Sequence, residues 1–199
     1  MDQVRKDASY SVGMSIGQSL QGQNLDQIDL EAFIVGINAI FNNETLKWTP
    51  EEANTKIGDY LNSVNDSRFA ENKSAGAEFL AANSSKEGIT TLESGLQYEI
   101  ITEGNGEKPG AESQVTVHYH GTLSDGTVFD SSVARGEPAT FGVNQVIKGW
   151  TEALQLMPAG SKWKLYIPEN LAYGANPHPG GPIKPFMTLI FDVELISIN

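Results

Sequence analysis

The chain contains no cysteine among its 199 residues. Disulfides, iron–sulfur clusters, thiolate zinc sites and a cysteine nucleophile are therefore excluded. The sequence also lacks an apolar run of about 18 residues, so it predicts no membrane-spanning helix. Positive charge is scarce, because 13 lysines and arginines stand against 25 aspartates and glutamates, for a net charge of −12. Nucleic acids and anionic membranes bind clustered positive charge, so we expect neither as a partner.

The first residues show no basic segment followed by an apolar stretch, which is the pattern of a secretory signal. We therefore expect a cytoplasmic location, or a periplasmic one if a signal peptide was removed from the chain.

Proline is almost missing from the first half of the sequence. Pro50 stands alone there, and the other eight prolines lie between Pro109 and Pro185. Because proline disrupts helix interiors, this asymmetry predicts a helical N-terminal part and a turn-rich β C-terminal part, an α+β protein.

Two short helices are expected within residues 1–48. Apolar residues at helical spacing mark the first, and a stronger stripe from Leu30 to Phe41, with Asp29 as N-cap, marks the second. Helices this short do not form a core alone, so we expect this region to dimerise with a second copy. Gly13 and Gly17 in the first helix would let two helices approach closely. The alternative is that these glycines only relieve crowding within one chain.

A third helix has the clearest start in the sequence. Thr49 is followed by Pro50 and, at the third helical position, by Glu52, which is the pattern of a capping box with an N-terminal proline. The helical pattern continues to Gly88, a length of about 57 Å at 1.5 Å per residue. Its apolar face thins in the middle, so residues 49–88 are predicted to form a solvent-exposed stalk.

Residues 89–199 alternate between apolar and polar positions, which predicts β-strands. One stretch, residues 146–157, has helical spacing instead. We expect an antiparallel sheet with one short helix packed on it.

Phosphate-binding, nucleophile-elbow and zinc-protease motifs are all missing from the sequence. His118 and His120 are spaced as a metal-binding pair, but a third ligand is lacking, so we favour a solvent-facing role and predict no metal. His178, in a loop rich in glycine and proline, fits a loop role as well as a site role. Aromatic residues are frequent in the second half of the sequence. Composition alone does not show which of them belong to the hydrophobic core and which line a pocket.

Five short strings in the second half occur in a characteristic order. They are VHY at 117–119, DGTVFDSS at 125–132, VIKGW at 146–150, LAYG at 171–174 and TLIFDVEL at 188–195. This order resembles the FK506-binding-protein (FKBP) family of peptidyl-prolyl cis–trans isomerases. The strings ASYSVG at 8–13, FLAAN at 79–83 and LESGLQY at 92–98 resemble its dimeric, stalked bacterial branch, which includes the macrophage infectivity potentiators.

The resemblance implies three regions: a helical dimerisation region at 1–48, a stalk helix at 49–88 and an isomerase domain at 89–199. It implies an enzyme that catalyses rotation of X–Pro bonds in unfolded or folding proteins, in an aromatic pocket that desolvates and twists the imide. It also implies chaperone activity. No cofactor is implied, and macrolides of the FK506 or rapamycin type are possible ligands. The alternative function is a non-catalytic chaperone or scaffold that binds proline peptides.

The resemblance also implies roles for individual residues. The proline ring would lie on the Trp150 indole, within walls formed by Tyr119, Phe129, Val146, Ile147, Phe191 and, after a one-residue insertion, Ile183. The Tyr173 hydroxyl and the Ile147 backbone N–H would bind substrate carbonyls. Asp130 would act on the twisting carbonyl directly or by ordering Tyr119 and Arg135. Phe141 and His178 would contact the substrate.

Two departures from the family pattern affect the rim of the expected pocket. Ala139 occupies a position where many members have an aromatic residue, which opens the rim, and the loop at 176–182 differs in sequence.

Overall fold

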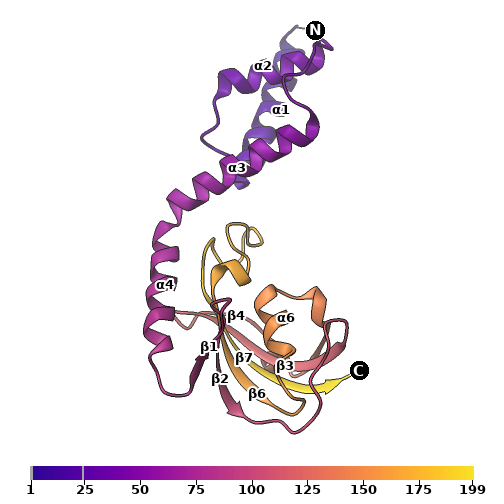
Figure 1. The fold of residues 1–199 in the computed structure, drawn as a ribbon. Coiled ribbons are helices and arrows are strands. Elements are labelled where there is room, and N and C mark those ends of the chain that lie inside the picture. Colours follow the sequence, from indigo (N-terminus) through magenta and orange to yellow (C-terminus); the bar gives the residue numbers. More distant parts are fainter. Residues whose placement is uncertain (1, 24) are drawn as a thin grey trace. The chain divides into compact units, whose positions relative to one another are not determined.

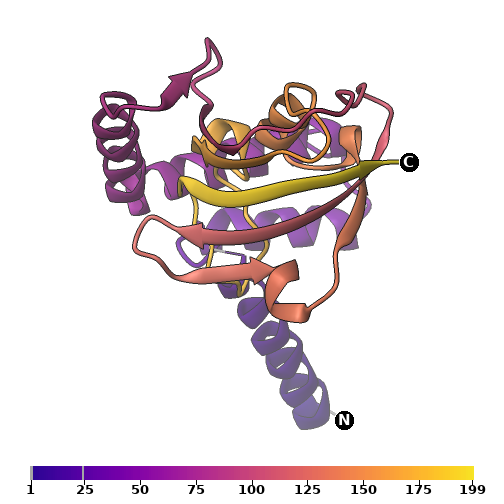
Figure 2. The same ribbon diagram turned by 90° about the horizontal axis from the view of Figure 1, so that it is seen from below.

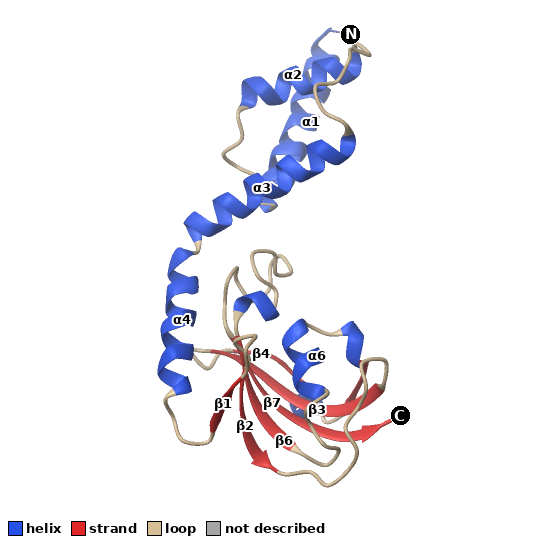
Figure 3. Cartoon of the chain, viewed as in Figure 1, coloured by secondary structure: helices blue, strands red, loops and turns tan. Residues whose placement is uncertain are grey.

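The computed structural model describes residues 2–23 and 25–199, in two compact units, Met1–Ser67 and Arg68–Asn199. The first unit is helical, and the second combines an antiparallel sheet with helices (Figures 1 and 3). The predicted α+β class is therefore confirmed. No helix in the described residues is long and apolar enough to cross a membrane.

The N-terminal unit contains α1 (Asp2–Gly22), α2 (Leu30–Phe41) and α3 (Pro50–Arg68). The predicted helix starts of α2 and α3 are both present. The Ala32 N–H donates to the Asp29 carboxylate at 3.0 Å. The Thr49 N–H donates to Glu52 Oε2 at 2.9 Å, and the Glu52 N–H donates to Thr49 Oγ1 at 3.3 Å, which closes the capping box.

The single helix predicted over residues 49–88 is two helices in the structure. The chain leaves the helical conformation at Phe69 (φ −118°, ψ 23°), and α4 spans Ala70–Ser84. α4 packs against the sheet, where Gly76 and Asn83 are buried and the Asn83 amide donates to Gln97 Oε1 at 2.9 Å. One side of α4 is thus covered, while ten of its fifteen residues stay exposed. The structure corrects the single continuous helix, because these contacts fix residues 70–84 as a separate helix beside the sheet.

The sheet forms the centre of the second unit. Its strands are β1 (Ile89–Thr91), β2 (Gln97–Thr102), β3 (Gln114–Leu123), β4 (Val128–Ser131), β5 (Ala139–Gly142), β6 (Lys162–Ile167) and β7 (Leu189–Ile198). They are antiparallel in the order β1-β2-β6-β7-β3-β4, and β5 pairs with β3. The longest strands, β3 and β7, lie side by side in the centre of the sheet (Figure 2).

Four short helices connect the strands. They are α5 (Ser132–Arg135), the 3-10 helix η1 (Val143–Gln145), α6 (Lys148–Leu154) and the 3-10 helix η2 (Glu169–Leu171). α6 lies against one face of the sheet, and the core between them includes Val117, Leu154 and Leu165. A Cβ on Gly149 would lie 2.5 Å from Ile167 Cγ2, so α6 approaches β6 as closely as only glycine permits. This close approach places Trp150, the next residue, over the sheet.

Candidate active site

Trp150, in the first turn of α6, lies at the centre of an aromatic cluster. The residue is only 4% exposed. The rings of Tyr119, Phe141 and Phe191 meet it nearly at right angles, with centroid distances of 5.4, 5.9 and 5.2 Å. Edge-to-face contacts of this kind are favourable and define ring orientation. They hold the indole as the base of a cavity.

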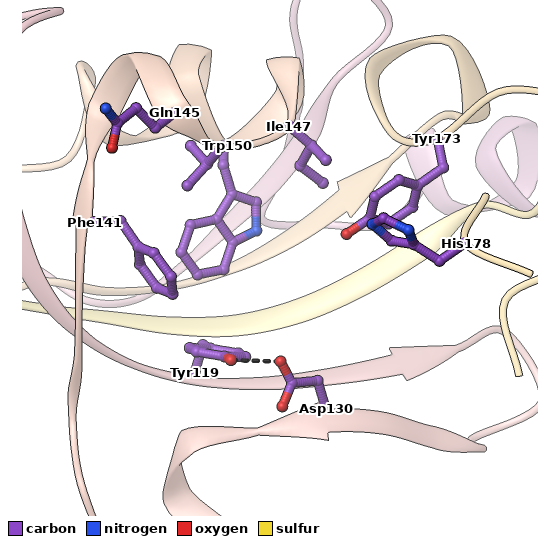
Figure 4. Close-up of a pocket in the computed structure, with 9 residues that line it drawn as sticks. Tyr119, Asp130, Phe141, Gln145, Ile147, Trp150, Tyr173 and His178 are labelled. Atoms are coloured by element: carbon purple, nitrogen blue, oxygen red, sulfur yellow. Dashed lines mark hydrogen bonds between the residues drawn. The ribbon is translucent and has the colours of Figure 1, made fainter. Parts of the chain in front are cut away.

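The cavity above Trp150 has a volume of about 450 Å³ (Figure 4). Nine residues line it: Tyr119, Asp130, Phe141, Gln145, Val146, Ile147, Trp150, Tyr173 and His178. Eight of them are among the predicted site residues. Gln145 was missed, although it directly precedes Val146 and Ile147 and the same connection, from η1 to α6, presents all three.

A smaller hollow of about 210 Å³ adjoins the main cavity. Asp130, Tyr173 and His178 line both spaces, and Phe129 and Ile183 line only the smaller one. The other three residues that line the smaller hollow are Pro177, Gly181 and Pro182. They belong, with Tyr173, His178 and Ile183, to the flap, which we define as residues 172–188. The structure therefore places Phe129 and Ile183 next to the main cavity.

Phe191 supports the cavity from behind. Its ring packs on Phe129 at 5.3 Å and on Trp150 at 5.2 Å. Both phenylalanines also crowd Gly121 of β3, where a Cβ would lie 2.6 Å from Phe129 Cε2 and 2.9 Å from Phe191 Cε1. Gly121 is thus a supporting position that we did not single out in the sequence.

Asp130 is held between Tyr119 and Arg135. The Tyr119 hydroxyl donates to Asp130 Oδ2 at 2.5 Å, Arg135 Nη1 donates to Oδ1, and Arg135 Nη2 donates to the Tyr119 hydroxyl at 2.8 Å (Figure 4 shows the first bond). Arg135 is thus outside the cavity lining and binds the two residues that do line it.

These bonds shift the pKa values of the group. Partial burial raises the pKa of Asp130, but the hydrogen bonds from Tyr119 and Arg135 outweigh it, so the pKa lies below its ordinary value. Burial and the bond to Asp130 raise the pKa of Tyr119. At neutral pH the carboxylate is therefore charged and the tyrosine hydroxyl is protonated.

Tyr173 presents a hydrogen-bond donor to the cavity. Its ring lies 6.2 Å from the His178 ring, and its hydroxyl points into the cavity (Figure 4). Burial, followed by the charge of Asp130, raises the pKa of Tyr173, so the hydroxyl keeps its proton.

The two strand histidines are placed elsewhere. His118 Nδ1 pairs with Ser132 Oγ at 3.1 Å and His120 Nδ1 with Ser131 Oγ at 3.0 Å. Neither is among the residues that line the two cavities.

Among the described residues, those that line the main cavity include no serine, cysteine or lysine nucleophile. It offers apolar surface for a ring, with protonated hydroxyl donors at the edge. The fold and the cavity thus define a domain with an aromatic cavity suited to noncovalent binding, on an antiparallel sheet that packs on one helix.

Comparison with known proteins shows the family to which the chain belongs. A family model described as FKBP-type peptidyl-prolyl cis-trans isomerase matches residues 105–196, and one for the domain amino-terminal to such isomerases matches residues 5–100. The chain belongs to the FKBP-type peptidyl-prolyl cis–trans isomerases and is such an enzyme.

Three relatives illustrate the similarity. The outer membrane protein MIP of Legionella longbeachae is 47% identical, over 96% of this chain and 84% of that protein. The FKBP-type 22 kDa isomerase of Escherichia coli K12 is 44% identical, over 99% and 97%. The crystal structure of FkpA from Escherichia coli matches with a TM-score of 0.64 and 33% identity, over 99% of this chain and 95% of that one.

Proposed function

We propose that the cavity catalyses rotation of X–Pro bonds in protein clients by holding the proline ring on the Trp150 indole. Rotation is opposed by amide resonance, with a barrier of about 18–20 kcal/mol. Water stabilises the charge-separated resonance form, so removing water from the amide lowers the barrier. Each 1.4 kcal/mol or so by which the site stabilises the twisted transition state more than the bound ground state raises the rate about tenfold. The buried aromatic base of the cavity supports this mechanism.

Two donors would orient the peptide in the cavity. The Tyr173 hydroxyl would donate to one substrate carbonyl. The backbone N–H of Ile147 would donate to the carbonyl after proline, because N–H groups at a helix start lack helical acceptors. Asp130 would act by ordering Tyr119, since both of its oxygens already accept hydrogen bonds.

A protease-coupled assay with an Xaa-Pro tetrapeptide tests the proposed role of Asp130. We expect the full chain to accelerate isomerisation and Asp130→Ala to be slower, because Tyr119 and Arg135 lose their common acceptor. Asp125→Ala is the matched control, since that carboxylate only accepts the Thr127 N–H in an exposed turn. Equal rates for the wild type and Asp130→Ala would contradict the role. A peptide that binds without acceleration would favour the non-catalytic alternative.

We also propose that the chain forms a homodimer through its N-terminal helices. α1 and α2 enclose a groove of about 680 Å³ that is lined mainly by apolar side chains. Leu30 and Phe41, at its edge, are 66% and 78% exposed. A Cβ on Gly13 or Gly17 would meet no atom within 4 Å, so a second backbone has room to approach. A second copy of the same face would cover this apolar surface.

Sedimentation velocity tests the dimer. We expect a dimer at micromolar concentration, and a monomer for Ile34→Asp, which introduces a charge into the groove. Ile196→Asp, an exposed substitution in the other unit, should remain dimeric. A monomeric wild type would overturn the proposal.

Chaperone activity is a further part of the proposed function, supported by the same apolar groove. Ile34→Asp should keep its rate on tetrapeptides and lose much of its effect on the refolding of a proline-limited protein. An undiminished effect on refolding would contradict a role for the groove.

We propose binding of FK506-type macrolides to the main cavity, which inhibition of the peptide assay tests. The cytoplasmic location stays a prediction, which cell fractionation would test.

A further inference from the structure

One peptide bond of the flap is held from both sides. The carbonyl oxygen of Pro185 accepts a hydrogen bond from the Asn72 side-chain amide of α4 at 3.0 Å. The N–H of the same peptide unit, on Phe186, donates to the Gly174 carbonyl at 2.9 Å. Gly174 directly follows Tyr173, whose hydroxyl points into the cavity (Figure 4). A continuous path of two hydrogen bonds therefore leads from α4 to the residue beside Tyr173.

The backbone at Phe186 is strained, which shows that its surroundings impose its conformation. Phe186 has a φ of +61°, in the left-handed region that a bulky residue rarely adopts. The side chain is only 6% exposed, and the Lys73 ammonium of α4 lies 5.1 Å from the centre of its ring. α4 and Gly174 together contact this residue and the peptide bond that precedes it.

Close backbone packing places α4 against this end of the flap. A Cβ on Gly76 would lie 2.6 Å from Thr188 Oγ1 and 3.9 Å from the Phe186 carbonyl oxygen. Further along the helix, α4 is anchored to the sheet, where the Phe79 ring packs on Tyr166 at 6.1 Å and the Gln97 amide donates to the Leu80 carbonyl at 2.8 Å. The helix is therefore fixed to the sheet at one end and to the flap at the other.

We propose that Asn72 is a positioning residue for the isomerase reaction, an inference that rests on the substrate contact proposed above for Tyr173. Through the Pro185–Phe186 peptide unit, α4 holds the flap so that the Tyr173 hydroxyl meets the substrate. The flap also presents His178 and Ile183 to the two cavities. Loss of the Asn72 bond leaves the Pro185 carbonyl without this donor and frees the flap end from α4. The ring of Tyr173 then samples more orientations, and each bound substrate forms its hydrogen bond to Tyr173 less often.

The test is a double-mutant cycle in the full chain, with the tetrapeptide assay as readout. Asn72→Ala should lower kcat/KM about fivefold, which is the rate factor that corresponds to the net free energy of one ordinary hydrogen bond. In the background of Tyr173→Phe, which lacks the hydroxyl, Asn72→Ala should have little further effect, because the positioned donor is already gone. Ser74→Ala is the control on α4, since its hydroxyl bonds to the Glu71 carbonyl of its own helix, and it should stay within twofold of the wild type.

A purely structural role predicts a different result. If Asn72 only stabilised the fold, Asn72→Ala would lower the melting temperature and would reduce activity by the same factor with or without the Tyr173 hydroxyl. That additive result would overturn the proposal, as would unchanged activity of Asn72→Ala. Faster hydrogen exchange of the Phe186 amide in Asn72→Ala is a second expected result.

Gly76→Ala provides an independent route to the same end of the flap. Its new Cβ would displace Thr188, so kcat/KM should fall. Adding Thr188→Ala removes Oγ1 and leaves the Thr188 Cβ at 3.6 Å, an ordinary contact, so the double variant should regain most of the activity. Gly58→Ala, in α3 with no atom within 4 Å of the new Cβ, is the matched control. Failure of the second substitution to restore activity, with the fold intact by circular dichroism, would contradict the proposed contact.

Discussion

Gly121→Ala should disturb the aromatic cluster without adding any polar or charged group. Gly121 lies on β3 opposite Asp130 of β4 and Phe191 of β7. The new methyl carbon would be 2.6 Å from Phe129 Cε2, 2.7 Å from Phe129 Cζ and 2.9 Å from Phe191 Cε1, all below the closest distance that real side chains show. Both rings must move. The ring of Phe191 contacts Trp150 at 5.2 Å, so the displacement reaches the base of the cavity.

Overpacking of a well-packed core costs about 1–3 kcal/mol. For a unit of this size, about 4 °C of melting temperature is lost per kcal/mol. Gly121→Ala should therefore melt about 4–12 °C lower in differential scanning calorimetry. Its kcat/KM on a tetrapeptide should also fall, because the Trp150 indole at the base of the cavity is displaced. Gly110→Ala is the matched control, because its Cβ would be 3.7 Å from Ser113 Oγ in an exposed loop.

Phe129→Leu should relieve part of the strain in Gly121→Ala, because it removes the ring atoms that the methyl group would meet. The cost of Gly121→Ala should thus be smaller in Phe129→Leu than in the wild type. A melting temperature for Gly121→Ala equal to that of Gly110→Ala, with unchanged kcat/KM, would refute the ring geometry on which the description of the cavity depends.

Three further predictions concern charge and capping. The pKa of Asp130 is lower in the folded state, so the stability that its charged form contributes is full above the ordinary carboxyl pKa and is lost as pH falls through the folded value. As pH falls below the ordinary carboxyl pKa, urea unfolding should show a shallower loss of stability for Asp130→Asn than for the wild type, and equal slopes would contradict this. Tyr119→Phe removes a donor to that carboxylate and should cost about 1 kcal/mol with lower kcat/KM; unchanged stability and activity would count against the bond. Thr49→Ala should cost the N-terminal unit about 1 kcal/mol by loss of the cap, seen by calorimetry, with tetrapeptide activity unchanged; an unaltered transition would show that the cap adds nothing.

Local features of the sequence were sufficient to predict the helix starts and the fold class. A cap depends on residues three apart, so Asp29 and the pair of Thr49 and Glu52 are visible without tertiary information. The change of period after residue 89 likewise marks the start of the sheet. Of the predicted site, Asp130 and Tyr173 came from the order of short strings, because composition alone did not separate pocket aromatics from core aromatics.

Long-range contacts account for what the sequence did not predict. Asn72 and Pro185 are 113 positions apart, and a side-chain bond to a backbone carbonyl leaves no periodic pattern. The segment from Asp66 to Gly76 has few apolar positions, which is why the sequence predicted an exposed stalk. In the structure, much of the contact of α4 with the rest of its unit comes from polar or small residues, as at Gly76 and Asn83, which hydropathy does not detect.

The position of α4 also determines where an isomerase fragment should begin. A fragment that starts at residue 89 would lose the helix that covers Phe186, Tyr166 and Gln97, all of which are buried in the full chain. Exposing them should lower the melting temperature and loosen the flap, so residues 89–199 should show a higher KM than residues 68–199 on the same tetrapeptide. Residues 68–199 coincide with the compact unit and should match the full chain on peptides. Equal KM values for the two fragments would show that the flap holds its conformation without α4, since the sheet and the rest of the pocket are common to both.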